Sequence, residues 1–151
     1  MSVLDDFAAF RKTAFGVLVS KAYPTLAVET KVLFTVSDLC IVTSIFGVVT
    51  TAITTVASTV KLQSNPTLAL ATTIDIATVS ADIGGTDTPA GDILGINAAG
   101  AVALSQVTNV QRNIVVAAGA IEQVSVAAVT GGITWYLTYV PVAAGATIVA
   151  A

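Results

Sequence analysis

The carboxylates of Asp82, Asp87 and Asp92 have the spacing that comes closest to a site, since they recur at five-residue intervals in a glycine-rich stretch. Carboxylate oxygens in a loop can bind calcium. The spacing and the terminal glutamate of an EF-hand are missing, and Gly84-Gly85 lacks the lysine of a phosphate-binding loop. We therefore expect 84–92 to be a solvent-facing loop whose acids keep it soluble, with a calcium site as the alternative. No metal and no cofactor is predicted.

Nucleophilic chemistry has few candidate residues, because the chain contains no histidine and a single cysteine, Cys40. Without histidine, a Ser-His-Asp or Cys-His nucleophile and every histidine-containing metal site are excluded. Cys40 cannot form an intramolecular disulfide, and its position in the apolar run 39–42 predicts a small buried hydrophobe. No catalytic residue is predicted, and we expect that the protein is not an enzyme.

The aromatic cluster is formed by Trp135, Tyr136 and Tyr139. On a strand, Trp135 and Tyr139 share one face with Leu137, and Tyr136 points to the other face. Trp135 and Tyr139 are interpreted either as core residues that anchor the final hairpin, which we favour, or as a sugar-stacking platform. Tyr136 is a candidate interface residue, because aromatic side chains are enriched where subunits meet.

The elements that must position these residues are predicted to be short strands, because β-branched residues and period-two alternation dominate after residue 24. In 31–37, for example, Val32, Phe34 and Val36 fall on one face, and Phe46-Gly47 and Asn65-Pro66 are expected to be turns. The fold prediction is mainly β, with an antiparallel β-sandwich or jelly-roll-like body. The expected strands cover 31–37, 39–43, 46–51, 56–62, 68–71, 74–79, 93–96, 101–104, 114–116, 120–126, 133–140 and 147–149.

A helical arm is predicted over residues 2–20. Ser2 can cap its N-terminus, and Asp5 and Asp6 suit the positive end of the helix dipole. Its apolar stripe supplies further interface candidates, and Tyr23-Pro24 ends it. The predicted domains are therefore an arm at 1–24 and a β-sandwich at 25–151, and the arm packs either on its own domain or on a neighbouring subunit. The interface candidates on the stripe are Leu4, Phe7, Phe15 and Leu18.

Charge is scarce: charged residues make up 10% of the chain, against about 25% in ordinary soluble domains. After Asp92 only Arg112 and Glu122 are charged, and the net charge is −3. An acidic chain predicts no nucleic-acid partner. The uncharged run 39–60 is long enough to span a membrane, but its many serines and threonines favour strands, so no membrane partner is predicted. A monomer would expose adhesive apolar surface, and we therefore expect a homo-oligomer.

Five segments resemble small virion proteins of tailed bacteriophages. They read IVVAAGAIE at 114–122, GITWYLTYVP at 132–141, GATIV at 145–149, LFTV at 33–36 and GVVTTAI at 47–53. Gly131-Gly132 stands where the group usually has one glycine. The resemblance implies a decoration (cement) protein located on the virion, at the capsid surface. It further implies a partner, the major capsid protein, and a trimer, since such proteins tend to occupy threefold positions. The alternatives are a head fibre, tail tube or tail-tip subunit, or a carbohydrate-binding adhesin.

Overall fold

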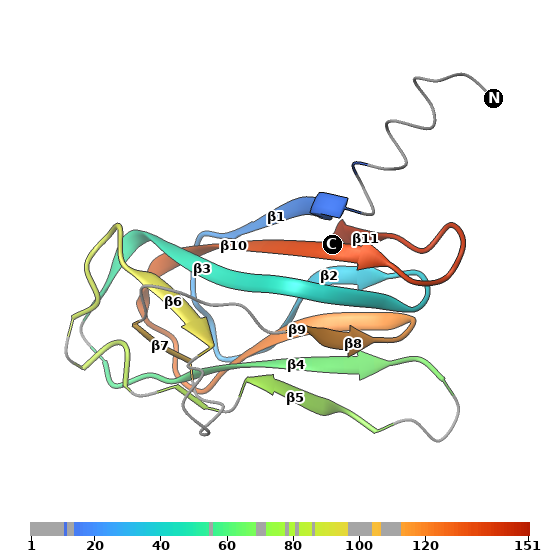
Figure 1. Ribbon diagram of the computed structural model, residues 1–151. Helices are drawn as coiled ribbons and strands as arrows, with labels where there is room; N and C mark the ends of the chain where they lie inside the picture. Colours follow the sequence, from blue (N-terminus) through green and yellow to red (C-terminus); the bar gives the residue numbers. More distant parts are fainter. Residues whose placement is uncertain are drawn as a thin grey trace.

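The strands form two antiparallel sheets (Figure 1). The computed structural model describes residues 11, 14–54, 56–68, 72–77, 79–80, 82–85, 87–96, 104–106 and 113–151. The prediction of a mainly β fold is confirmed. Within the described residues, no helix is long and apolar enough to cross a membrane.

One sheet, which we call the β3 sheet, has the strand order β1-β10-β3-β6-β7, and β8 also pairs with β3. The other, the β9 sheet, has the order β11-β2-β9-β4-β5. The strands of the β3 sheet are β1 (Val17–Tyr23), β3 (Cys40–Thr54), β6 (Ile93–Ile96), β7 (Leu104–Gln106), β8 (Ile114–Val116) and β10 (Thr130–Pro141). Those of the β9 sheet are β2 (Thr30–Val36), β4 (Val60–Pro66), β5 (Ile74–Ala77), β9 (Gly119–Ser125) and β11 (Ile148–Ala150).

The strand pairing is nested along the chain. β1 pairs with β10, β2 with β9, β3 with β8 and β6, and β4 with β5. Successive strands β1 to β4 alternate between the two sheets. Such a pattern arises when a long two-stranded hairpin folds over so that successive strand pairs are divided between two facing sheets. The strand expected at 93–96 is confirmed as β6, and it pairs antiparallel with β7, which shares only Leu104 with the strand expected at 101–104.

The core lies between the two sheets and follows the alternation of β10. Ile133, Trp135, Leu137 and Tyr139 are buried, whereas Tyr136 is half-buried on the opposite face. The prediction for this aromatic cluster is therefore confirmed. Across the core, the indole N–H of Trp135 donates to Oε1 of Gln123 on β9 at 2.7 Å, and Gln123 Nε2 donates to the Ser125 hydroxyl at 2.8 Å. This buried polar chain ties the two sheets together.

The turn expected at Phe46-Gly47 is wrong, because β3 runs through both residues without a break. Gly47 lies directly opposite Trp135, and a Cβ on Gly47 would come within 2.7 Å of Ile133 Cγ2 and 3.1 Å of the Trp135 ring. The glycine therefore leaves room for both the Ile133 methyl group and the indole ring. A sequence pattern cannot distinguish this use of glycine from a turn.

Two other strand predictions need correction. In β2 a register irregularity between Val32 and Phe34 turns Leu33 into the core and leaves Val32 partly exposed. The strand predicted at 56–62 is instead β4, which begins at Val60 and continues through Asn65 and Pro66. The latter two residues pair with β9 rather than forming a turn. Proline is tolerated there because it is the last residue of the strand.

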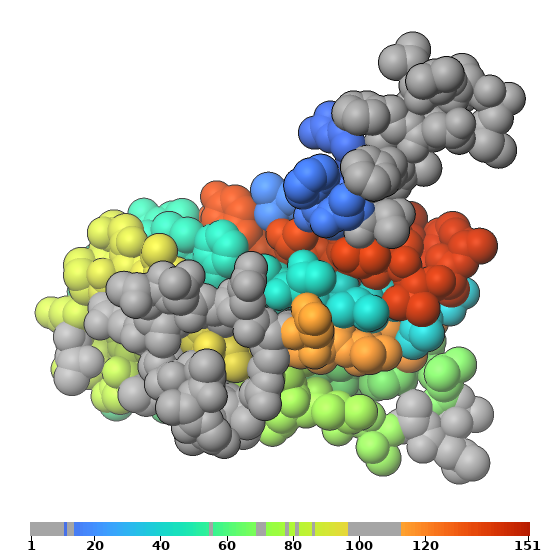
Figure 2. All heavy atoms as spheres, in the orientation of Figure 1, coloured from blue at the N-terminus to red at the C-terminus, as the bar shows by residue number. Residues whose placement is uncertain are grey.

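The predicted N-terminal helical arm is wrong over its last residues. Val17–Tyr23 is a strand that pairs with β10 over its whole length, and Figure 2 shows the blue residues of β1 lying against the red C-terminal part of the chain. Cross-strand packing against β10 thus overrides the helical spacing of Leu18 with the residues before it. Leu4 and Phe7 lie outside the described residues.

Gly47→Ala should destabilise the protein by about 1–3 kcal/mol, because the added methyl overpacks the core against Trp135. Urea unfolding followed by circular dichroism measures this change. In an Ile133→Ala background the cost of Gly47→Ala should shrink, since the group nearest to the added methyl is removed. Equal costs in both backgrounds would show that the glycine does not serve to make room for the Ile133 methyl group.

Candidate functional site

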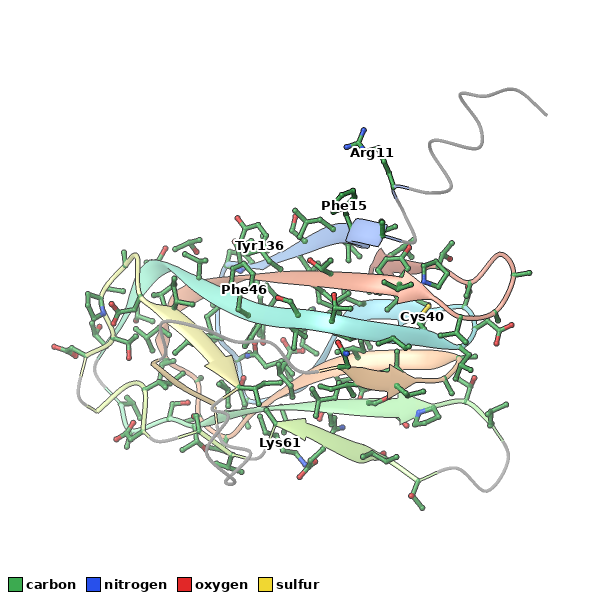
Figure 3. All side chains as sticks on the ribbon, in the orientation of Figure 1. Arg11, Phe15, Cys40, Phe46, Lys61 and Tyr136 are labelled. Atoms are coloured by element: carbon green, nitrogen blue, oxygen red, sulfur yellow. The ribbon has the colours of Figure 1, made fainter. Side chains whose placement is uncertain are left out.

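The centre of the outer face of the β3 sheet is an aromatic pair. Ser20, Tyr136, Phe46 and Gly95 stand in one row across β1, β10, β3 and β6. The rings of Phe46 and Tyr136 stack with centroids 5.3 Å apart and an interplanar angle of 17°, and Figure 3 shows them side by side. An offset stack of this kind holds both rings in a defined orientation.

The other outward positions of these strands carry no charge. Lys21 is the one charged residue in β1, β3, β6, β8 and β10. It lies opposite Trp135, so it belongs to the inner side, and its Nζ donates to the carbonyl of Ala151. We call the outward side the uncharged face. It consists of Leu18, Ser20, Ala22, Ile41, Thr43, Ser44, Phe46, Val48, Ile93, Val115, Thr134, Tyr136, Thr138 and Val140.

Large apolar side chains stand exposed on and beside the uncharged face. Leu18 is 63% exposed and Val115 is 65% exposed. Phe15, just before β1, is 76% exposed. Of the predicted interface residues, the structure therefore places Phe15, Leu18 and Tyr136 on one side of the molecule. Phe46 was not identified from the sequence, because only its register with Tyr136 brings it to this face.

The outer face of the β9 sheet is charged, and we call it the charged face. Lys61 Nζ contacts Asp75 Oδ1 at 2.9 Å, and Lys61 projects from the side of the molecule opposite Tyr136 (Figure 3). Glu122 is buried, and its carboxylate accepts hydrogen bonds from Gln63 at 2.7 Å and Asn65 at 3.2 Å. The two outer faces thus differ in charge, while exposed apolar side chains occur on both, Val149 of β11 among them.

Sugar stacking by Trp135 and Tyr139 is excluded, because both side chains lie in the core. Their rings cannot reach a ligand without opening the protein. The alternative interpretation of this aromatic cluster is therefore wrong, and the core interpretation is confirmed. The aromatic rings nearest the surface of the β3 sheet are instead those of Phe46 and Tyr136.

Asp82 is a structural acid rather than a solubilising one. Its Oδ1 accepts backbone N–H bonds from Ser58 at 2.9 Å, Gly84 at 3.0 Å and Gly85 at 2.9 Å. The three N–H donors hold the pKa of the Asp82 carboxyl below its usual value. Gly85 has the largest effect, followed by Ser58 and Gly84. The carboxylate thereby fixes the start of the loop to the segment before β4.

The prediction of a solvent-facing loop at 84–92 is only partly right. Gly84 and Thr88 are buried, and Thr88 exchanges two backbone hydrogen bonds with Ile53 of β3. Asp87 is exposed. Across the described residues, no three histidine, cysteine or acidic side chains are grouped so that they could hold a metal ion.

Burial raises the pKa of two further titratable side chains, Cys40 and Tyr23. Cys40 is fully buried, as predicted, and burial, together with the nearby Asp38 carboxylate, raises the pKa of its thiol. Burial also raises the pKa of Tyr23, whose hydroxyl donates to Glu29 Oε1 at 2.7 Å. A thiol that resists ionisation is a poor nucleophile.

A groove of about 400 Å³ opens between the edges of the two sheets. Its lysines already have acceptors or an anion nearby: Lys21 donates to Ala151, and Lys31 Nζ lies 4.0 Å from Glu29 Oε1. The groove is therefore poorly suited to bind an anion. The residues that line it are Lys21, Glu29, Thr30, Lys31, Val32 and Ala151.

No protein-family model, curated protein or solved structure matches this chain. The resemblance to phage virion proteins rests on the five segments quoted above and stays a prediction.

Asp82→Asn should lower the melting temperature at neutral pH, because it removes the charge that the three N–H donors stabilise. The folded-state pKa is lowered, so this stabilisation is complete above the unfolded pKa of about 4 and is lost as the pH falls through the folded value. The difference between wild type and variant should therefore vanish in acid. Asp87→Asn, at an exposed position whose positive φ asparagine tolerates, is the control. A difference that persisted at low pH would contradict the assignment.

Proposed function

We propose that this protein is a structural subunit of a tailed-phage virion that decorates the capsid and stabilises it through subunit contacts. The observation that supports this most is the contrast between the two outer faces. An uncharged face centred on Phe46 and Tyr136 suits burial in an assembly, and a charged face with Lys61 and Asp75 suits contact with solvent.

The nested strand pairing supports a jelly-roll classification, an architecture that viral capsid proteins share with lectins and cupins. Architecture alone does not determine a function. It is compatible with the resemblance of the five segments to virion proteins.

The proposed mechanism is mechanical. Copies of the protein, in a trimer, contact one another and the major capsid protein, and each contact adds interface area that resists the pressure of packaged DNA. Many weak contacts made at once hold a multivalent subunit far more tightly than one contact does. Phe15, Leu18 and Tyr136 are the described residues proposed for the contacts, and Leu4 and Phe7 are further candidates.

The second candidate function is a carbohydrate-binding adhesin, with Phe46 and Tyr136 in place of the buried pair. Sugar sites combine ring stacking with well-placed polar groups that fix the orientation of the ligand. Within β1, β3 and β10 the outward polar groups beside Phe46 and Tyr136 are serine and threonine hydroxyls, without an amide, carboxylate or guanidinium. The uncharged face therefore favours the protein-contact function.

An antibody against this chain should label the capsid surface of purified virions of the source phage in immunogold electron microscopy. Particles assembled without the protein should release their DNA at a lower temperature than complete particles, because they lack the added contacts. Particles supplemented with the purified protein are the control and should regain the original release temperature. Absence of the chain from purified virions would overturn the proposal, and labelling of the tail would favour the tail-subunit alternative.

A further inference from the structure

We infer that the uncharged face is the surface through which this chain binds a second copy of itself. The inference rests on the proposed function, because it names the surface that the proposed oligomer uses. It commits to a copy of this chain as the occupant, rather than to the capsid protein or a glycan.

The charge distribution selects this face for self-association. The chain carries a net charge of −3, so copies repel one another unless the contact lies away from the acids. Contact through the charged face would require each copy to take the Lys61–Asp75 ion pair out of water beside the Glu122 carboxylate. The uncharged face carries no acid and no base, so a copy can meet it without like-charge repulsion, and a highly charged partner would find no counter-charge there.

The size of the face fits a specific protein contact. With a rise of about 3.4 Å per residue and about 4.8 Å between strands, β1, β3, β6, β8 and β10 offer a flat area of about 670 Å². Side-chain relief increases the accessible area toward the about 800 Å² that each partner buries in a standard interface.

The shape of the uncharged face suits packing against a second copy. Phe46 and Tyr136 form a ridge whose rings are already stacked, so little side-chain entropy is lost when a copy packs on it. In the same row, Ser20 stands exposed on the β1 side of the ridge, whereas Gly95 on the β6 side is buried. The small side chain of Ser20 leaves a shallow flank that can receive a large side chain of a neighbour, such as Leu18.

Size-exclusion chromatography with light scattering tests the inference at micromolar concentration. The wild type should run at a multiple of 15.2 kDa. Leu18→Lys and Tyr136→Lys should each weaken association about tenfold or more, because a lysine charge would lose its water at the contact. Both variants should then run as folded monomers. Leu18 is 63% exposed, so its substitution does not disturb the core even if Tyr136→Lys proves unstable.

Val149→Lys is the matched control, since Val149 is 52% exposed on β11, the edge strand of the other sheet. It should leave the oligomer intact. A monomeric wild type, or dissociation by Val149→Lys but not by Leu18→Lys, would overturn the inference. A monomer retained on immobilised polysaccharide, with retention lost in Tyr136→Lys, would also overturn it in favour of the adhesin.

The virion experiment separates this inference from the proposed function. A chain that is monomeric in solution but labels the capsid leaves the proposed function standing and removes the inference. A chain that associates through the uncharged face but is absent from virions removes the proposed function and leaves the self-association standing.

Discussion

The contact between Trp135 and Gln123 joins the two sheets, and much of the structure depends on it. An indole N–H buried without an acceptor costs free energy, so the side chain of Gln123 must stand opposite it at 2.7 Å. Gly47 must lack a side chain, because a Cβ there would meet both Ile133 and the indole ring. The Ser125 hydroxyl then accepts a hydrogen bond from Nε2 of Gln123. β3, β9 and β10 are thereby fixed relative to one another. The register of β3 against β10 also places Phe46 opposite Tyr136.

The few acids are used mostly for local structure. Asp82 gathers three backbone N–H groups at the start of a loop, Glu29 accepts from the buried Tyr23 hydroxyl, and Glu122 accepts from two side-chain amides. The spacing of Asp82, Asp87 and Asp92 suggested a solvated loop and, as an alternative, a calcium site. Hydrogen bonding explains Asp82 better, because its carboxylate has three backbone donors from the protein itself, whereas Asp87 is exposed as predicted.

The distribution of charge between the two outer faces links fold to function. Alternation along each strand sends every second residue outward, so an uncharged strand gives an uncharged outer surface unless its neighbours supply charge. In the β3 sheet they do not, since Lys21 belongs to the inner side. The sheet thereby presents apolar and hydroxyl groups with a stacked aromatic pair at the centre, and this surface is the basis of both proposals.

The sequence by itself determined the mainly β fold, the burial of Cys40 and the opposite orientations of Trp135 and Tyr136, because alternation and residue type are local properties. It misassigned Phe46-Gly47 as a turn and residues 17–20 as part of a helix. Only the tertiary structure decided these, since a glycine that admits an indole and a strand that pairs with β10 depend on residues about ninety and one hundred and twenty positions away. The uncharged face also depends on the tertiary structure. The scarcity of charge could be read from the composition, but which residues lie on this face depends on strand register, and register is set by long-range packing.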